Sequence, residues 1–123
     1  MTRFLMLIAA FVVAFPVAGF AQNVDPFNAN YTGNFDVTSS SGDYQCDSVK
    51  MDGSISNGRA RFTISHNNVL LTGTLGVDGG LRLSGMDGRY QYVLDGQYYN
   101  GEISGNWGIL PTGCAGFWVV RPR

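Results

Sequence analysis

Few side chains in this sequence have types that could do acid–base or nucleophilic chemistry. His66 is the only histidine, and the spacing around it marks no nucleophile or orienting acid as its partner. Asp78, Asp87 and Asp95 each precede a glycine, a position where aspartate commonly accepts a turn hydrogen bond. No glycine run links a strand to a helix, as a phosphate-binding loop does. We therefore expect no enzyme activity, no catalytic residues and no cofactor.

Aromatic residues form the candidate binding constellation. Five of them fall on the inner face of the predicted strands and could line a pocket at one mouth: Tyr90, Tyr92, Tyr98, Trp107 and Trp118. Their hydroxyl and indole groups would give such a pocket its polar handles. The alternative is that the rings fill the interior as core. A second apolar set faces outward and could form a protein-binding patch if it is contiguous: Leu70, Val93, Tyr99, Phe117 and Val119.

Residues 1–21 have the features of a cleaved signal peptide. Arg3 provides the positive charge, an apolar run covers residues 4–17, and small residues stand near the end of the segment. A transmembrane anchor is the alternative, but Pro16 interrupts the run, which is shorter than the ~20 residues of a spanning helix. The leader predicts export to the bacterial periplasm or the medium, with no membrane attachment after cleavage.

The two cysteines, Cys46 and Cys114, both follow the leader. An exported chain meets an oxidising compartment, where thiols pair. A metal site is the alternative, but two cysteines and one histidine this far apart are too few to hold a metal. We predict a Cys46–Cys114 disulfide and no metal.

The chain after the leader is short and carries little net charge. Subtracting the leader's 21 residues from 123 leaves 102, enough for one domain. Without Arg3 there are seven basic and nine acidic residues, a net charge near −2. This balance gives no electrostatic reason to expect nucleic acid or an anionic membrane as a partner. We expect a flexible lead-in over residues 22–29 and a single domain over residues 30–123.

Residues 94–107 have the pattern of a complete β-hairpin. Asn100-Gly101 suits a type I′ turn, in which both central residues have positive φ. Closing the turn there pairs Gly96 with Gly105. One face is then apolar with a glycine at its centre, and the other face is polar. The same apolar-x-Gly-x-apolar unit recurs along the chain.

Four further turn signals divide the rest of the chain into strands: Asn57-Gly58, Asn67-Asn68, Asp78-Gly79-Gly80 and Asp87-Gly88. The first turn pairs Gly53 with Phe62, and the second places Phe62 opposite Gly73. The third aligns Gly73 with Gly85, and the fourth aligns Gly85 with Tyr90.

These signals indicate about eight short strands joined mostly by tight turns, with no helical period after the leader. We predict an all-β fold, a small antiparallel up-and-down meander closed into a barrel, because closure removes the exposed edges. Inward glycines at mid-strand permit the sharp coiling that a narrow barrel needs. A two-sheet β-sandwich is the alternative.

The order of these elements carries a resemblance that covers nearly the whole chain after the leader. It runs from Tyr31-x-Gly33 through Cys46 and the glycine-containing stretches 57–62, 71–75 and 78–83 to Cys114. The pattern resembles a broad group of small, secreted, uncharacterised proteins of proteobacteria. The resemblance implies a fold and export, and no activity.

Residues 44–47, residues 84–90 and a late cysteine are similar to periplasmic inhibitors of c-type lysozyme. Those proteins are small β-barrels in which a Ser-Gly loop and a downstream lysine enter the lysozyme cleft. The resemblance implies an inhibitor loop at Ser84, Gly85 and Arg89. The family's Trp-x-Lys-Gly stretch is absent here, and Leu94-Asp95-Gly96 stands nearby. Residues 89–98 also look like one strand of avidin.

The scaffold pattern, the aromatic constellation and the lack of a catalytic set together predict an exported, non-catalytic β-barrel. We expect it to bind a small ligand or a protein partner through a barrel mouth or loops. The alternative is a periplasmic inhibitor of lysozyme or another cell-wall hydrolase.

Overall fold

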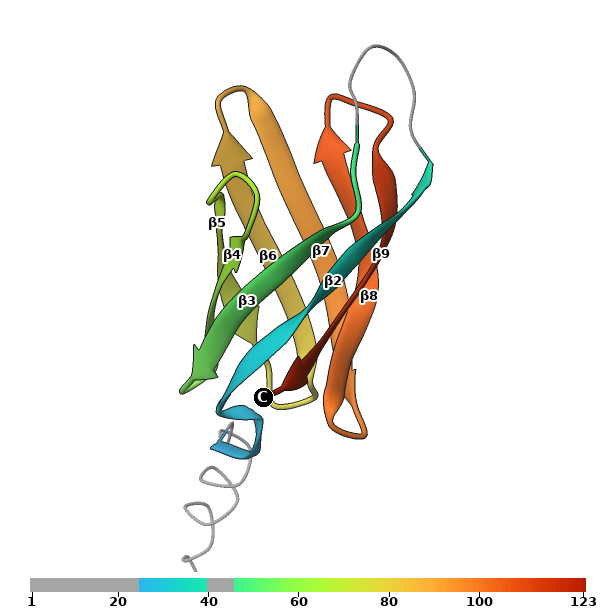
Figure 1. Cartoon of the computed structure of the whole chain (residues 1–123). Helices are drawn as coiled ribbons and strands as arrows, with labels where there is room; N and C mark the ends of the chain where they lie inside the picture. The colour runs from blue at the N-terminus through green and yellow to red at the C-terminus, as the bar shows by residue number, and fades with distance from the viewer. Residues whose placement is uncertain (1–24, 40–45) are drawn as a thin grey trace, which may run out of the picture.

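The computed structural model describes residues 25–39 and 46–123. Within them, eight antiparallel strands follow one another around a closed barrel (Figure 1): β2 (Ala29–Ser39), β3 (Val49–Ser56), β4 (Arg59–Ile64), β5 (Leu70–Leu75), β6 (Gly80–Asp87), β7 (Tyr90–Tyr99), β8 (Glu102–Leu110) and β9 (Ala115–Pro122). Pairing of β2 with β9 closes the sheet. The predicted all-β meander and its closure into a barrel are confirmed. The predicted signal peptide lies outside the described residues.

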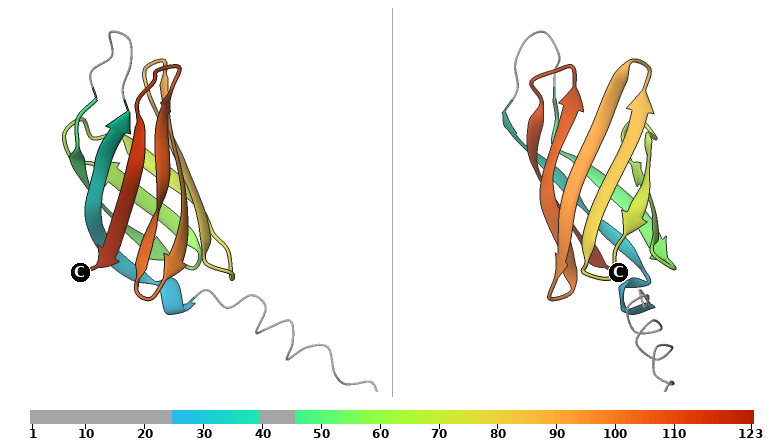
Figure 2. Two further views of the ribbon diagram at one scale, coloured as in Figure 1. Left: turned by 90° about the vertical axis from the view of Figure 1, so that its right-hand side faces the viewer. Right: turned by 180° about the vertical axis from the view of Figure 1, so that it is seen from behind.

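The strands run between two ends of the barrel, at a tilt to its axis (Figure 2). The upper end, as drawn in Figure 1, holds the β4–β5, β6–β7 and β8–β9 connections. The lower end holds the β3–β4, β5–β6 and β7–β8 turns and the C-terminus. The names upper end and lower end are used in this sense below.

Two of the predicted turns form as expected. Asn57 and Asn100 have φ angles of 53° and 54°, and the glycines that follow them also have positive φ, as a type I′ turn requires. The turns set Gly53 opposite Phe62 and Gly96 opposite Gly105. Both predicted registers are confirmed.

The β4–β5 turn is longer than predicted. Phe62 lies opposite Leu71, and not opposite Gly73 as the two-residue turn required. The backbone N–H of Ile64 donates to the carbonyl of Val69 at 3.0 Å, so the closing pair spans a four-residue turn. The predicted register was wrong by two residues.

The β5–β6 register was also wrong by two residues. Gly73 lies opposite Leu83, and not opposite Gly85. The backbone N–H of Gly76 donates to the carbonyl of Gly80 at 2.9 Å, so the loop closes one residue earlier than predicted.

The β6–β7 turn is centred one residue later than predicted. Gly88, with a φ of 60°, occupies the first central position, which is where a type II′ turn needs glycine. Gly85 therefore lies opposite Tyr92, and not opposite Tyr90. Each of the three errors is a shift of two residues, so every inward residue stays inward.

Apolar side chains fill the barrel interior. The largest of the fully buried ones are Trp118, Tyr31, Phe35, Phe62 and Met51. The rings of Tyr31 and Phe62 lie 6.2 Å apart between centroids, and those of Phe35 and Trp107 lie 5.2 Å apart. These rings therefore pack against one another inside the barrel, as aromatic pairs in a core do.

Inward glycines let neighbouring strands approach closely. A Cβ on Gly105 would collide with the carbonyl oxygen of Asp95 on the neighbouring strand, β7. A Cβ on Gly116 would collide in the same way with the carbonyl of Asp36 on β2. The wall is coiled so tightly at these positions that it has no room for a side chain.

A short 3-10 helix, η2 (Asp25–Phe27), precedes β2 and lies at the lower end (Figures 1 and 2). The rings of Phe27 and Tyr98 meet edge to face, with centroids 4.7 Å apart. The Tyr31 hydroxyl donates to the Phe27 carbonyl at 2.7 Å. Phe27, which belongs to the predicted lead-in, is therefore packed against the barrel.

Candidate functional site

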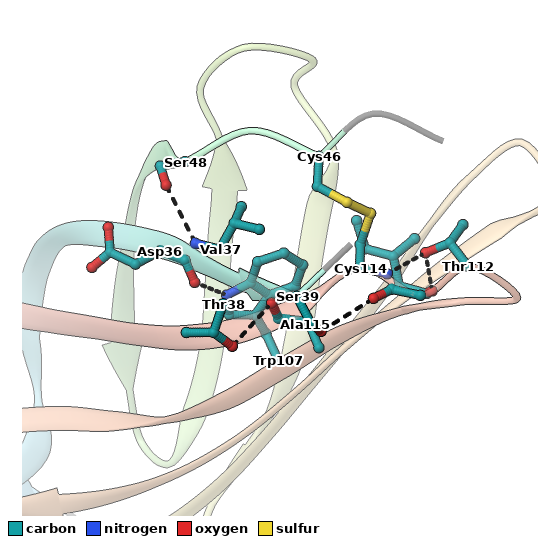
Figure 3. Close-up of a disulfide and its surroundings, with 12 residues drawn as sticks. Asp36, Val37, Thr38, Ser39, Cys46, Ser48, Trp107, Thr112, Cys114 and Ala115 are labelled. Carbon is teal, nitrogen blue, oxygen red and sulfur yellow. Dashed lines mark hydrogen bonds between the residues drawn. A yellow bond between two sulfur atoms is a disulfide. The ribbon is translucent and has the colours of Figure 1, made fainter. Parts of the chain in front are cut away.

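The predicted disulfide between Cys46 and Cys114 is confirmed and lies at the upper end (Figure 3). Its Cα atoms are 5.9 Å apart, and it joins the segment before β3 to the connection between β8 and β9. The backbone N–H of Cys114 donates to the Thr112 hydroxyl oxygen at 3.0 Å, and that hydroxyl donates to the carbonyl of Ile109 at 2.6 Å. The β8–β9 connection is therefore fixed both by the disulfide and by the hydrogen bonds of the Thr112 side chain.

A small pocket lies beneath the disulfide at the upper mouth. It is lined by Phe35, Cys46, Asp47, Val49, His66, Tyr92, Trp107 and Ile109. Its volume is about 30 Å³, which is about the share of one water molecule in the liquid. This mouth can hold water, but it is far too small for the ligand that the sequence analysis expected there.

The five predicted ligand-binding aromatics do not converge on one pocket. Tyr92, Trp107 and Trp118 are core side chains with 3%, 4% and 1% of their surface exposed. Tyr90 follows the β6–β7 turn at the upper end, and Tyr98 packs on η2 at the lower end. The sequence left open whether these rings line a pocket or fill the core. The burial of Trp107 and Trp118 supports the filled core.

Both indole N–H groups are satisfied by carbonyls of the barrel wall. Trp118 Nε1 donates to Asp95 at 3.0 Å and to Asn106 at 3.2 Å. Trp107 Nε1 donates to Phe117 at 2.9 Å and to Asp36 at 3.1 Å, the latter drawn in Figure 3. The indole N–H groups that the sequence offered as ligand contacts are therefore already hydrogen-bonded to backbone carbonyls.

The residues of the predicted inhibitor loop are not together in a loop. Ser84 and Gly85 lie within β6, where Ser84 is exposed on the outer face and Gly85 is on the inner face. Only Arg89 lies in the β6–β7 turn, where its Nη2 donates to the Tyr90 hydroxyl at 3.2 Å. This hydrogen bond raises the pKa of Arg89. Ser84 and Gly85 are therefore strand residues, and the inhibitor role that the resemblance implies for them stays a prediction.

His66 lies exposed in the β4–β5 turn at the upper end. Within residues 25–39 and 46–123, no three acidic, cysteine or histidine side chains gather closely enough to hold a metal ion. In the same part of the chain, no helix is both long and apolar enough to cross a membrane.

No family model, curated protein or solved structure matches this chain. The resemblances noted in the sequence therefore stay predictions, and the candidate site is built from geometry alone.

The outward apolar residues are split into separate places. Phe117 and Val119 are neighbours on the outer face of β9. Tyr99 is two strands away on β7, beyond the ion pair between Arg121 and Glu102, whose Nε and Oε2 atoms are 2.7 Å apart. The ion pair therefore separates Tyr99 from Phe117 and Val119 in register, and these two residues are the outward apolar pair on β9.

A groove runs over the outer surface of β2, β9 and β8, and we call it the Phe117 groove. Its volume is about 430 Å³, and its lining residues are Asp36, Glu102, Ser104, Gly105, Asn106, Phe117, Trp118, Val119 and Arg121. Phe117 is 58% exposed and lies between Asp36 on β2 and Asn106 on β8. The groove therefore combines an exposed aromatic ring with hydrogen-bonding side chains on either side.

Sequence reasoning singled out the exposed Phe117 but not the polar residues around it. Side chains alternate between the two faces of the last strand, and this alternation predicted that the Phe117 ring faces outward. Asp36 reaches the groove only because β2 pairs with β9. These are the first and last strands in the sequence, although they are neighbours in the barrel. That pairing has no local signal in the chain.

Proposed function

We propose that this chain is an exported, non-catalytic binding module that holds a saccharide in the Phe117 groove. The single observation that carries the proposal is the exposed ring of Phe117, which lies within a groove bordered by polar side chains. The mouth pocket, with about 30 Å³, offers no comparable space. Binding on the outside of a filled barrel is the function that this arrangement supports best.

A saccharide matches the groove because it combines an apolar C–H face with a rim of hydroxyl groups. The C–H face of a sugar would cover the Phe117 ring and remove exposed apolar surface from water. Asp36, Ser104 and Asn106 offer both donors and acceptors to the hydroxyls.

Export is the part of the proposal that rests on the leader and on the disulfide. Disulfides persist in oxidising compartments such as the periplasm and the extracellular medium. The Cys46–Cys114 bond is compatible with such a compartment. The cell envelope is also where a saccharide-binding module would meet its ligand.

The test is a titration of the isotope-labelled mature protein with the trimer of N-acetylglucosamine, followed by amide chemical shifts. We expect shifts on β8 and β9 around Ser104, Asn106 and Phe117. Phe117→Ala should abolish them. Met86→Ala is the matched control, because Met86 on β6 is also 58% exposed and lies outside the groove. Equal shifts in wild type and Phe117→Ala would contradict the proposal.

The inhibitor alternative is tested with the same variants in a lysis assay with a c-type lysozyme. An unchanged lysis rate at a large excess of the protein removes that alternative. Inhibition that persists in Phe117→Ala and is lost in Arg89→Ala would instead assign the function to the β6–β7 turn.

A further inference from the structure

Two rows of hydrogen-bond donors cross the outer surface of β3, β4, β5 and β6. The backbone registers align the first row as Ser54, Arg61, Thr72 and Ser84. They align the second row as Ser56, Arg59, Thr74 and Arg82. Each arginine of β4 therefore has a hydroxyl residue directly opposite it on both neighbouring strands, and neither row contains a carboxylate within these four strands.

Within residues 25–39 and 46–123, the two arginines of β4 are not neutralised by ion pairs. Among the described residues, Arg82 Nε pairs with Asp95 at 2.7 Å and Arg121 pairs with Glu102, whereas no ion pair involves Arg59 or Arg61. The acidic residue nearest in register is Asp52, which lies on β3 opposite Thr63, one outward position beyond Arg61. In a chain with more acidic than basic residues, this face has unpaired positive charge.

A groove accompanies the two arginines. It has a volume of about 560 Å³ and is lined by Arg59, Ala60, Arg61, Thr72, Gly73 and Thr74. The long arginine side chains stand on β4, and the short threonines stand on β5. A ligand in this groove would meet guanidinium groups on one side and hydroxyls on the other.

We propose that this groove, the Arg59–Arg61 groove, binds a ligand that carries two phosphate groups. A guanidinium group makes paired hydrogen bonds to phosphate oxygens, and these bonds are strengthened by the opposite charges. Residues two apart on a strand are about 7 Å apart, so Arg59 and Arg61 can each engage one phosphate of an extended ligand. The hydroxyls of Thr72 and Thr74 are placed to donate to the remaining oxygens.

This site is independent of the saccharide proposal. The Arg59–Arg61 groove is lined by residues of β4 and β5, and the Phe117 groove by residues of β2, β8 and β9. These are separate sets of strands in the closed barrel (Figures 1 and 2). The two share no lining residue. Either site can therefore fail without the other. The phosphate groups could belong to a soluble molecule or to the headgroups of a lipid surface.

The soluble arm titrates the labelled mature protein with tripolyphosphate, and with orthophosphate for comparison. We expect amide shifts on β4 and β5, tighter binding of tripolyphosphate than of orthophosphate, and weaker binding as salt is raised. Arg59→Gln with Arg61→Gln should weaken tripolyphosphate binding at least tenfold. Both side chains are exposed, so the variant should keep the spectrum of the folded barrel.

The matched control replaces two arginines outside the groove, Arg89→Gln with Arg123→Gln, which changes the net charge by the same amount. The control should bind tripolyphosphate within about twofold of wild type. Equal losses in the two double variants would mean that the anion is attracted by positive charge in general, and would overturn the proposal.

The lipid arm measures co-sedimentation with phosphatidylglycerol vesicles and with phosphatidylcholine vesicles. Sedimentation with the anionic vesicles that requires Arg59 and Arg61 supports the proposal and assigns the phosphates to a membrane surface. Binding of tripolyphosphate without vesicle binding supports it and assigns them to a soluble ligand. The absence of both overturns it.

Discussion

The indole ring of Trp118 lies directly against Gly96. A Cβ on Gly96 would be only 2.5 Å from Cζ2 of the ring and 3.2 Å from the carbonyl oxygen of Ser104. The same indole donates its N–H to the carbonyl of Asp95, the residue before that glycine, at 3.0 Å. The glycine thus makes room for the ring, and the ring provides a donor for the wall carbonyl beside it.

Replacing Gly96 by alanine should destabilise the barrel. The added methyl group cannot fit unless the Trp118 ring or the β8 backbone moves, and overpacking of this kind costs roughly 1–3 kcal/mol. Urea unfolding followed by tryptophan fluorescence would show the loss as a lower midpoint.

Gly108→Ala is the matched control for this variant. Gly108 lies on the neighbouring strand, β8, and the nearest atom to its added Cβ is the Cys114 carbonyl oxygen at 3.7 Å, an ordinary contact. Its free energy of unfolding should stay within about 0.5 kcal/mol of wild type, as for most surface changes. Similar losses for the two alanine variants would contradict the role assigned to Gly96.

Removing the disulfide should lower stability by up to about 4 kcal/mol, because the bond limits the unfolded chain over a long loop. Cys46 and Cys114 are 68 positions apart. Cys46→Ala with Cys114→Ala should unfold at clearly lower urea than the oxidised protein, since the loss is a large share of a small domain's stability. Reduced wild type should match the variant, and a midpoint equal to that of the oxidised protein would contradict the expectation.

The inward and outward faces could be predicted from the sequence, but three of the registers could not. Alternation of apolar and polar residues decides which side of the sheet a residue is on. A slip of two residues leaves that side unchanged, so the burial pattern cannot detect it. Phe62 would be buried opposite either Gly73 or Leu71. The register is decided by which two residues form the last hydrogen-bonded pair before the turn, here Ile64 and Val69.

The Arg59–Arg61 groove depends on one of these registers. With the predicted two-residue β4–β5 turn, Arg61 would face Thr74 and Arg59 would face Gly76, so the second donor row would not form. In the structure Arg61 faces Thr72 and Arg59 faces Thr74. The Phe117 groove depends on a different pairing, that of β2 with β9, which closes the barrel and sets Asp36 opposite Phe117. The sequence showed which side chains face outward, but only the pairing of strands determines which of them lie side by side in a groove.

Replacing Trp118 by phenylalanine should cost about 3 kcal/mol. The change removes the indole hydrogen bonds to the carbonyls of Asp95 and Asn106, and each hydrogen bond of this kind contributes about 0.5–1.5 kcal/mol. The smaller ring also leaves a void beside Gly96. Urea unfolding followed by circular dichroism measures the loss.

A benzothiophene analogue of tryptophan at position 118 separates these two causes, because it keeps the shape of the indole but has no N–H. It should retain the packing and lose only the hydrogen bonds, so its stability should lie between those of wild type and Trp118→Phe. Stability equal to wild type would mean that the indole N–H contributes nothing.

Tyr31 should make the barrel less stable at alkaline pH. Burial raises the pKa of its hydroxyl, with a smaller contribution from Tyr98, and the hydroxyl donates to the Phe27 carbonyl at 2.7 Å. The unfolded chain then releases this proton near pH 10 while the folded chain retains it. Stability from Tyr31 is therefore complete below about pH 10 and falls as pH rises toward the folded pKa. Urea midpoints between about pH 8.5 and 11 should fall less steeply in Tyr31→Phe than in wild type. Tyr99→Phe, at a residue that is 79% exposed, is the matched control, and a Tyr31→Phe slope equal to that of wild type would contradict this account.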